Sequence, residues 1–466
     1  MSSSSPPPPL LPPLPSSSSS SSQGNDGGGD EYEGPSRSRP RGAVNEVWPE
    51  PFLEALATHV ATDAALFAGR LAAAQALANV FQVCSTWQAI SHSDLLWQRL
   101  THRIWHRRHL LHRTWRQEYM YRHRTARNFR TRRSVHFNLR FDVEDPTDPN
   151  ALSCRCLAIS DHHLAAGFAD GAVRVFSLRT RLHSRTFRPL YRDRLGPFSR
   201  AVSGIVLSGS ARLVFATLDG DIHVASLNTN NNNNKARVGD VLNDGALVDF
   251  AGCGQWWVGL YAGVPGRAFQ IWNGQSEELT FVGGSLTDAQ AVAGWRTLTE
   301  STEAVGRVRV SRGGESAVAC TDARVMVLDL RNQGVILGEE EYGSGVVVGC
   351  TEVWREAYLS VDGRGVASVR RVGRMVEEEM VLCGFGVGGA AVMGCLNGGC
   401  AVICGGGGVV RVWGIERREG EYLYRFGERV QGEIKAMVAD DRHVALAAGD
   451  GAGIHLWDFG AAEEDE

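Results

Sequence analysis

The residues best suited to chemistry lie in a basic segment, Thr101 to Arg133, in which aromatic side chains are interleaved with arginines. The segment holds eleven Arg and five His against a single acid, Glu118, so its net charge is about +10 with His neutral. Because arginine binds phosphate and aromatic rings stack on bases, this composition is compatible with nucleic-acid binding. The candidate contacts to nucleic acid, or to the nuclear import machinery, are Arg122, Arg124, Arg127, Arg130, Arg132 and Arg133.

A structural interpretation of the same segment competes with nucleic-acid binding, and we favour it. The formal net charge of the whole chain is -4, so the remainder outside the basic segment carries about -14. A basic helix could therefore bridge two domains and pack its aromatic residues against an acidic neighbour. We predict a basic helical linker over residues 101–133.

Motifs for catalysis, metal binding or cofactor binding are weak in this sequence. Gly384 to Gly389 has the glycine spacing of a dinucleotide-binding loop, but Ala390–Cys395 then has a strand pattern instead of a helical one. No acid stands near twenty positions further on, since the next is Glu416. None of the ten cysteines forms a Cys-x-x-Cys pair, which argues against a zinc site. We expect no catalytic residue, metal or cofactor, and a protein that is not an enzyme.

Composition divides the 466 residues into several segments. The folded ones must position any functional residue. Residues 1–45 are rich in Ser, Pro and Gly and are predicted to be disordered, because they carry too little apolar surface to offset ordering entropy. Residues 46–100 show helical periodicity, and residues 461–466 form an acidic tail. No run of eighteen apolar residues and no secretory signal occurs, so a soluble intracellular protein is expected.

Residues 134–460 change to a period of two and repeat one unit. Each unit has two short apolar strands, a tight turn and a third strand. The last residues of successive third strands are 49, 47, 56, 42, 43 and 44 positions apart, the period of a propeller blade. The third strands are Val173–Phe176, Ile222–Ala225, Phe269–Trp272, Val325–Leu328, Ala367–Arg370, Val410–Trp413 and Ile454–Trp457.

Asp-Gly turns before several third strands support the repeat independently, because this dipeptide suits the positive φ angles of a two-residue hairpin turn. They are Asp170-Gly171, Asp219-Gly220, Asp362-Gly363 and Asp450-Gly451. The prediction is a mainly β fold, a seven-bladed WD-repeat-like β-propeller preceded by a small all-α domain and a disordered tail. The last unit lacks room for an outer strand, so we expect Val135–Phe141 to supply it and close the ring.

Three motifs in the helical segment resemble an F-box, the module that docks substrate receptors onto Skp-type adaptors of cullin–RING ubiquitin ligases. They are Trp48-Pro49, Val83–Trp87 and Leu95–Leu100. The helix around Trp115–Tyr119 resembles the linker of F-box proteins that carry WD repeats, and the repeats resemble degenerate WD repeats, of which Trp457-Asp458 keeps the signature dipeptide. The resemblance implies that the adaptor-binding residues are Pro49, Phe52, Leu53, Val83, Trp87 and Trp97.

Longer runs resemble one family of plant F-box proteins with degenerate WD repeats. They are Val47–Leu53, Tyr121–Thr131, Ala165–Gly171 and Ile454–Gly460. The resemblance implies a nuclear substrate-recognition subunit of a ubiquitin ligase that controls floral organ identity and organ growth. Its partners would be a Skp-type adaptor, through it a cullin, and nuclear target proteins.

The propeller face that carries the turns before the third strands is the candidate target-binding surface. Its candidate residues are Asp170, Asp219, Asp322, Asp362 and Asp450. The alternative is a transcriptional co-regulator in flower development that contacts DNA or transcription factors directly through the basic linker and the propeller. Adaptor capture and salt-dependent DNA binding would separate the two hypotheses.

Overall fold

A computed structural model describes residues 48–461, with gaps at 143–147, 149–150, 190–195, 210, 229–233, 285–305, 312–313, 321–323, 342–349, 355–356, 362–365, 373–378, 385–391, 406, 418 and 450–452. The predicted disordered tail, residues 1–45, and nearly all of the acidic tail lie outside these ranges. From Trp48 onward the helices and the propeller belong to one compact unit. None of the described helices is long and apolar enough to cross a membrane.

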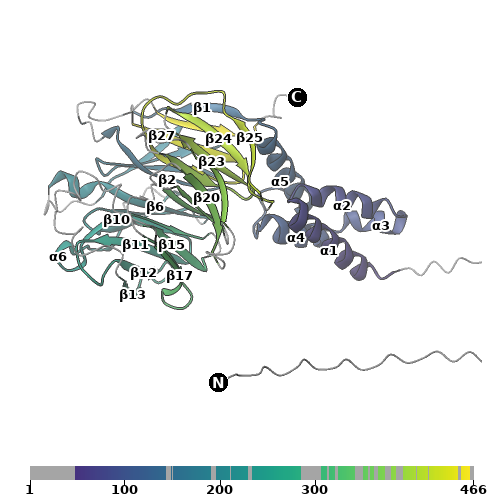
Figure 1. The fold of residues 1–466 in the computed structure, drawn as a ribbon, viewed down its shortest axis with the longest axis horizontal. Coiled ribbons are helices and arrows are strands. Elements are labelled where there is room, and N and C mark those ends of the chain that lie inside the picture. Colours follow the sequence, from purple (N-terminus) through teal and green to yellow (C-terminus); the bar gives the residue numbers. More distant parts are fainter. Residues whose placement is uncertain are drawn as a thin grey trace, which may run out of the picture. The chain divides into compact units, whose positions relative to one another are not determined.

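The N-terminal part of this unit is helical, as the periodicity predicts (Figure 1). Ser93 caps one helix, because its hydroxyl accepts from the Leu96 N–H at 3.4 Å. Gly69 ends the first helix with φ of 92°, a conformation that suits glycine. The elements are α1 (Glu50–Ala68), α2 (Ala72–Phe81), α3 (Ser85–Ala89), η1 (Ile90–His92), α4 (Asp94–Leu100), η2 (Thr101–Trp105) and α5 (Trp115–Arg130).

The remainder forms seven four-stranded antiparallel sheets, which confirms the seven-bladed propeller. The first three blades are β2 (Cys154–Ile159), β3 (His163–Phe168), β4 (Val173–Ser177), β5 (His183–Phe187); β6 (Val202–Ser208), β7 (Arg212–Thr217), β8 (Ile222–Ser226), β9 (Asn234–Arg237); and β10 (Ala246–Gly252), β11 (Trp256–Ala262), β12 (Phe269–Asn273), β13 (Leu279–Gly283). Two short helices, η4 (Pro197–Arg200) and α6 (Val241–Asp244), precede the second and third blades.

The other four blades follow the same order. They are β14 (Arg307–Val310), β15 (Ser316–Cys320), β16 (Arg324–Asp329), β17 (Val335–Glu341); β18 (Cys350–Trp354), β19 (Ala357–Val361), β20 (Val366–Arg371), β21 (Glu379–Gly384); β22 (Met393–Leu396), β23 (Cys400–Gly405), β24 (Val409–Gly414), β25 (Glu421–Arg425); and β26 (Ile434–Ala439), β27 (His443–Ala448), β28 (Ile454–Asp458) with β1 (Val135–Leu139).

The strand β1 closes the ring, as the sequence predicts. It pairs antiparallel with β28, so that Val135 lies opposite Asp458 and Leu139 opposite Ile454. The last blade is therefore built from the first strand and the last three strands of the propeller. This pairing removes an open edge that would otherwise remain on the third strand of that blade.

The first strand of each blade is innermost, because the first strands contact one another from blade to blade around the ring. Strand order within each blade is sequential, so the turns after the first and third strands lie on one face of the propeller. The turns after the second strands, and the starts of the first strands, lie on the other face. Apolar residues of adjacent blades interdigitate between the sheets and form the core.

Candidate protein-docking surfaces

The helical domain is attached to the face that carries the turns after the first and third strands, which we call the helix-side face. Arg107, which follows η2, lies 2.9 Å from Asp161 in the turn between β2 and β3. Its guanidinium also lies 3.0 Å from Asp441 in the turn between β26 and β27. Because β2 and β26 belong to the first and last blades, one arginine spans the junction where the ring closes.

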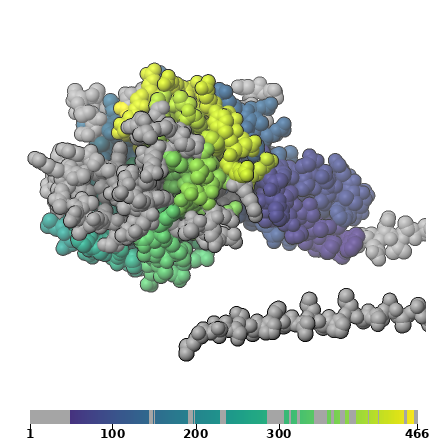
Figure 2. All heavy atoms as spheres, viewed as in Figure 1, coloured from purple at the N-terminus to yellow at the C-terminus, as the bar shows by residue number. Residues whose placement is uncertain are grey.

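Two more arginines contact the same face from other helical elements. Arg70, in the connection between α1 and α2, donates from Nε to Glu416 at 2.5 Å, and Glu416 follows β24. Arg122 of α5 is buried and lies 3.8 Å from Asp441. The purple and blue helical atoms therefore adjoin the yellow-green atoms of the last two blades in Figure 2.

The Arg122 side chain is neutralised mainly within its own helix. It donates from Nε to Glu118 at 2.8 Å, and both side chains are buried. Burial alone would raise the pKa of Glu118, but the charge of Arg122 and hydrogen bonds from His112, Arg122 and the Leu111 N–H outweigh it and lower the pKa. Arg122 is therefore unavailable for the nucleic-acid contact considered from the sequence.

Other parts of α5 and its C-terminal end contact the last two blades through apolar packing and hydrogen bonds. The rings of Phe129 and Phe459 stack with centroids 3.7 Å apart. Asn128 donates to the carbonyl of Phe459 at 2.8 Å, and Tyr424 donates to the carbonyl of Phe129. Arg130 forms an ion pair with Glu421 at the start of β25. The basic segment thus packs against the propeller, as the structural interpretation of the sequence expects.

The remaining candidate arginines of the basic segment lie on its surface. Arg124, Arg127, Arg132 and Arg133 are exposed. Two of the six candidate residues, Arg122 and Arg130, therefore face the helix core or the propeller, and four are accessible to a partner.

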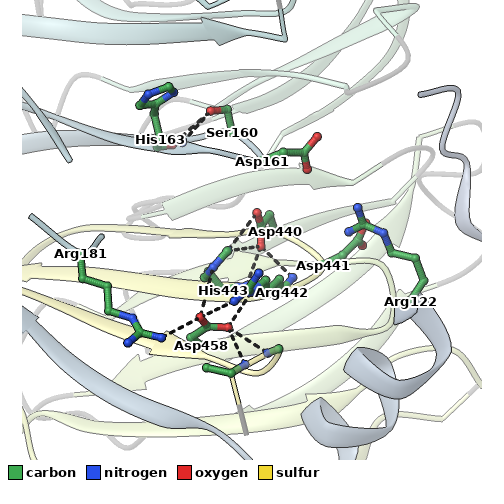
Figure 3. Close-up of polar contacts among 12 residues, drawn as sticks. Arg122, Ser160, Asp161, His163, Arg181, Asp440, Asp441, Arg442, His443 and Asp458 are labelled. Atoms are coloured by element: carbon green, nitrogen blue, oxygen red, sulfur yellow. Dashed lines mark hydrogen bonds and ion pairs between the residues drawn. The ribbon is translucent and has the colours of Figure 1, made fainter. Parts of the chain in front are cut away.

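A network of charged side chains lies beside the ring closure, on the same face. Asp458, at the end of β28, accepts from Arg442 Nε at 2.7 Å and from the Gly460 N–H at 2.8 Å (Figure 3). Arg181 and His443 each lie 3.8 Å from it. Burial would raise the pKa of Asp458, but the Arg442 hydrogen bond and the neighbouring positive charges lower it. The network stabilises the closing blade, because it ties the end of β28 to Arg442, Arg181 and His443.

Exposed apolar side chains gather at the end of the helical domain that lies away from the propeller. The helices α1 and α2 form a hairpin whose connection contains Arg70, the residue that contacts Glu416. The start of α1 and the end of α2 therefore both point away from the propeller, toward what we call the hairpin end (Figure 1). Trp48 and Phe52 stack there with ring centroids 4.8 Å apart.

The exposed fractions at the hairpin end are large for such side chains, at 48% for Trp48, 47% for Phe52 and 61% for Val83. Pro49 is also exposed, and Trp87 of α3 is half-buried. Large exposed apolar side chains that pack on each other are a feature of docking surfaces, so the stacked pair of Trp48 and Phe52 gives this end that character.

Two of the predicted adaptor contacts lie elsewhere. Leu53 and Trp97 are buried in the core of the helical domain, and Trp97 donates from its indole N–H to the Ser91 carbonyl at 2.7 Å. They can support a docking surface but cannot themselves touch an adaptor in this conformation. The resemblance to an F-box implied both as adaptor contacts, and helical periodicity alone does not separate an inner face from a partner-binding one.

Sequence reasoning did not identify Glu54, which ties α1 to α4. Its buried carboxylate accepts from Ser93 and lies 3.2 Å from Arg99. Asp441, Asp161 and Glu416 were also missed, because their partners are hundreds of residues away or on another domain. The one signal that the sequence offered for these contacts is a charged residue on an otherwise apolar helix face, and it identifies Glu54.

The other face of the propeller, which we call the opposite face, holds the turns after the second strands. Gly171 and Gly220 have φ of 85° and 84°, but Asp170 and Asp219 do not have positive φ. The glycines therefore fit the expectation, whereas the prediction of a two-residue hairpin turn at Asp-Gly, with positive φ at both residues, is wrong. Asp170 accepts from the Ala172 N–H at 2.9 Å, and Asp219 accepts from the Thr217 hydroxyl at 2.6 Å. Both carboxylates thus order their own turns. The other candidate target-binding residues, Asp322, Asp362 and Asp450, lie outside the described residues.

Among the described residues, no group of three or more His, Cys, Asp or Glu side chains could hold a metal ion. The described cysteines are not joined in disulfides, and burial raises the pKa of Cys400 and Cys404 to about 12. Such thiols pack as small apolar residues.

Comparison with known proteins supplies the family. No family model matches the chain. It is 60% identical over 437 residues to "Transcriptional regulator STERILE APETALA" of Arabidopsis thaliana, with 92% of this chain and 96% of that protein covered.

Two solved structures have a similar fold at low sequence identity. U3-55K is 12% identical with a TM-score of 0.51, covering 69% of this chain and 98% of that chain. The Cps50 (Swd1) β-propeller domain of Myceliophteria thermophila is 13% identical with a TM-score of 0.48, covering 70% and 99%. The first of these supports the propeller fold and nothing finer. Because the 60% identity extends over nearly the whole of both proteins, the chain belongs to the STERILE APETALA family.

Proposed function

We propose that this protein is a non-catalytic substrate-recognition subunit of a cullin–RING ubiquitin ligase, acting in the nucleus on regulators of floral organ identity and organ growth. The relationship to a transcriptional regulator and the propeller fold support a regulatory role through protein–protein contacts. The ligase role rests on the F-box-like motifs and on one structural observation, the exposed apolar hairpin end.

The hairpin end supports adaptor docking because it combines exposed aromatic residues with a rigid base. Trp48 and Phe52 stack on each other, and Leu53, one residue further on, is anchored in the helical core. Burying these side chains against a partner helix would release about 25 cal/mol for each square ångström of apolar surface.

The propeller would hold the target while the helical domain holds the adaptor. The ion pairs of Arg70 and Arg107 attach the two domains through three blades. A fixed attachment would keep a bound target at a constant position relative to the ligase, so proximity supplies the rate enhancement without a catalytic residue in this chain.

Adaptor capture by the purified full-length protein tests this proposal. A Trp48→Ala, Phe52→Ala, Val83→Ala triple variant should lose most recovery of a recombinant Skp-type adaptor, because the exposed apolar contacts are removed. The matched control is Leu66→Ala with Phe67→Ala, since these residues are 71% and 85% exposed at the other end of α1. Equal adaptor recovery by wild type and triple variant, or no recovery by wild type, would refute the docking proposal.

Direct DNA binding is a second candidate, favoured by the exposed positions of Arg124, Arg127, Arg132 and Arg133. Replacing these four by Gln should abolish duplex binding and flatten its salt dependence if the contact exists. The same variant should leave adaptor capture unchanged, so the two functions are separable.

A further inference from the structure

Lysine is scarce in this chain, although cationic residues are not. Of the 48 basic residues, 46 are arginine, and the two lysines are Lys235 and Lys435. Lysine is ordinarily among the commonest residues of soluble proteins. The first 234 residues, which include the whole helical domain, contain no lysine. The scarcity bears on a ubiquitin ligase subunit, because lysine side chains are the usual acceptors of ubiquitin.

Arginine cannot replace lysine as an acceptor of ubiquitin. The neutral Nζ amine of a lysine attacks the carbonyl carbon of the ubiquitin thioester on the conjugating enzyme. An isopeptide C–N bond forms, the C–S bond breaks, the thiolate stays on the conjugating enzyme, and the amine gives up a proton. A guanidinium remains protonated and delocalised at neutral pH, so it has no lone pair with which to attack. An arginine in place of a lysine therefore keeps the charge and removes an acceptor.

Contacts within the structure favour arginine at some positions. Arg107 contacts carboxylates on two different blades, and the buried Arg122 donates from Nε to Glu118. The planar fork of a guanidinium suits such contacts better than an ammonium group does. Packing therefore accounts for these two arginines.

Other arginines of the helical domain have no such contacts. Arg103, Arg108, Arg113 and Arg116 are exposed, and within the described part of the chain none of the four forms an ion pair with a carboxylate. A lysine would supply the same charge at each of these positions. The fold should therefore accept lysine on this surface, where the sequence has only arginine.

The two lysines both lie on the propeller, and one of them is already engaged. Lys435 of β26 lies 2.8 Å from Glu433, and its side chain is 23% exposed. Its strand is one of the innermost strands of the ring. Lys235 belongs to β9, the outermost strand of the second blade. The helical domain, which the adaptor would hold, thus has no lysine, and the propeller has one on an outer strand.

We propose that the scarcity of lysine spares this protein from conjugation by its own ligase and confines self-ubiquitination to Lys235. The inference rests on the proposed function, because that ligase supplies the ubiquitin thioester. A receptor subunit is held near the thioester at all times, so any accessible lysine on it would have a high effective concentration. With few such lysines, the ubiquitin passes to the bound target and the receptor survives repeated rounds.

Reconstituted ubiquitination tests the proposal, with the full-length protein, a Skp-type adaptor, a cullin–RING core, a conjugating enzyme, ubiquitin and ATP. Wild type should gain little ubiquitin, and Lys235→Arg should remove what it gains. The triple variant Arg108→Lys, Arg113→Lys, Arg116→Lys should gain ubiquitin about threefold faster or more, because three exposed amines are added at constant charge. The matched control replaces the same three arginines by Gln, adds no amine, and should behave as wild type does.

Amine labelling in the absence of the ligase checks that the added lysines are accessible. An N-hydroxysuccinimide ester should label all three in the lysine variant, and thermal melting should show every variant folded. Rapid self-conjugation of wild type, conjugation that persists in Lys235→Arg, or equal rates for wild type and the lysine variant would overturn this proposal. If the adaptor is captured in those cases, the docking proposal stands. Failure of wild type to capture the adaptor would overturn both.

Discussion

The guanidinium of Arg107 and the carboxylate of Asp441 are 334 residues apart in the chain and 3.0 Å apart in the structure. Asp441 is nearly buried, and Arg107 is largely enclosed between the first and last blades. The helical domain and the β-propeller are therefore held together by a contact from which water is largely excluded, and not by a flexible linker alone. Removing this ion pair should loosen the attachment of the helical domain to the propeller before it disturbs the apolar core of either part.

We expect Arg107→Ala to lower the free energy of unfolding by about 2–4 kcal/mol, because Asp441 and Asp161 lose their shared cation while Asp441 stays buried. Chemical denaturation of the full-length protein measures this. The exposed pair of Arg331 and Glu315 is the control, and Arg331→Ala should change stability by less than about 0.5 kcal/mol. Equal losses in both variants would show that burial at the interface does not matter.

Shortening a buried side chain of the closing strand β1 should also destabilise the protein. Leu139 is 1% exposed on β1, and Leu139→Ala is expected to cost about 2–4 kcal/mol through lost packing and a residual cavity. Asn138, its exposed neighbour, provides the control, since Asn138→Ala should be near neutral. The measurement is thermal or urea unfolding. A near-neutral Leu139→Ala would mean that the ring does not depend on β1.

Stability should fall in acid because of Glu118. Its pKa is lowered in the folded protein, so its stabilising contribution is present above the unfolded pKa of about 4.3 and is lost as pH falls through the lower folded value. Wild-type unfolding free energy should therefore decline below about pH 5, and Glu118→Gln should show a shallower decline from a lower plateau. Urea titrations between neutral and acidic pH test this, and parallel profiles would contradict it.

Substitutions of two tryptophans in the helical domain should separate an effect on folding from an effect on adaptor docking. Trp97→Ala should cost about 3–5 kcal/mol, because the side chain is buried in the helical core and its indole N–H is bonded to Ser91. Trp48→Ala should leave the melting temperature nearly unchanged, because half of that side chain is exposed. Any loss of adaptor capture in the Trp48 variant then reports on contact. A strongly destabilised Trp48 variant would refute this division.

Most of the fold could be predicted from local patterns in the sequence. Asp-Gly turns and a period of two are properties of neighbouring residues, so the seven units and the closing strand Val135–Leu139 could be predicted. The burial of Leu53 and Arg122 could not, because periodicity shows which residues share a face and not what that face meets. Contacts such as Arg70 with Glu416 join elements whose relative placement is set by the finished fold, and no local signal encodes them.

The closing strand has a mechanical consequence. Because β1 begins a few residues after α5 and pairs with the last strand of the ring, tension applied to the helical domain reaches the propeller first at this strand. A pulling force directed along the chain would peel β1 from β28 and open the seventh blade before loading the others. The propeller's resistance to extraction by an unfolding motor is then set at its seam, where Asp458, Arg442 and Phe129 hold the last blade in place.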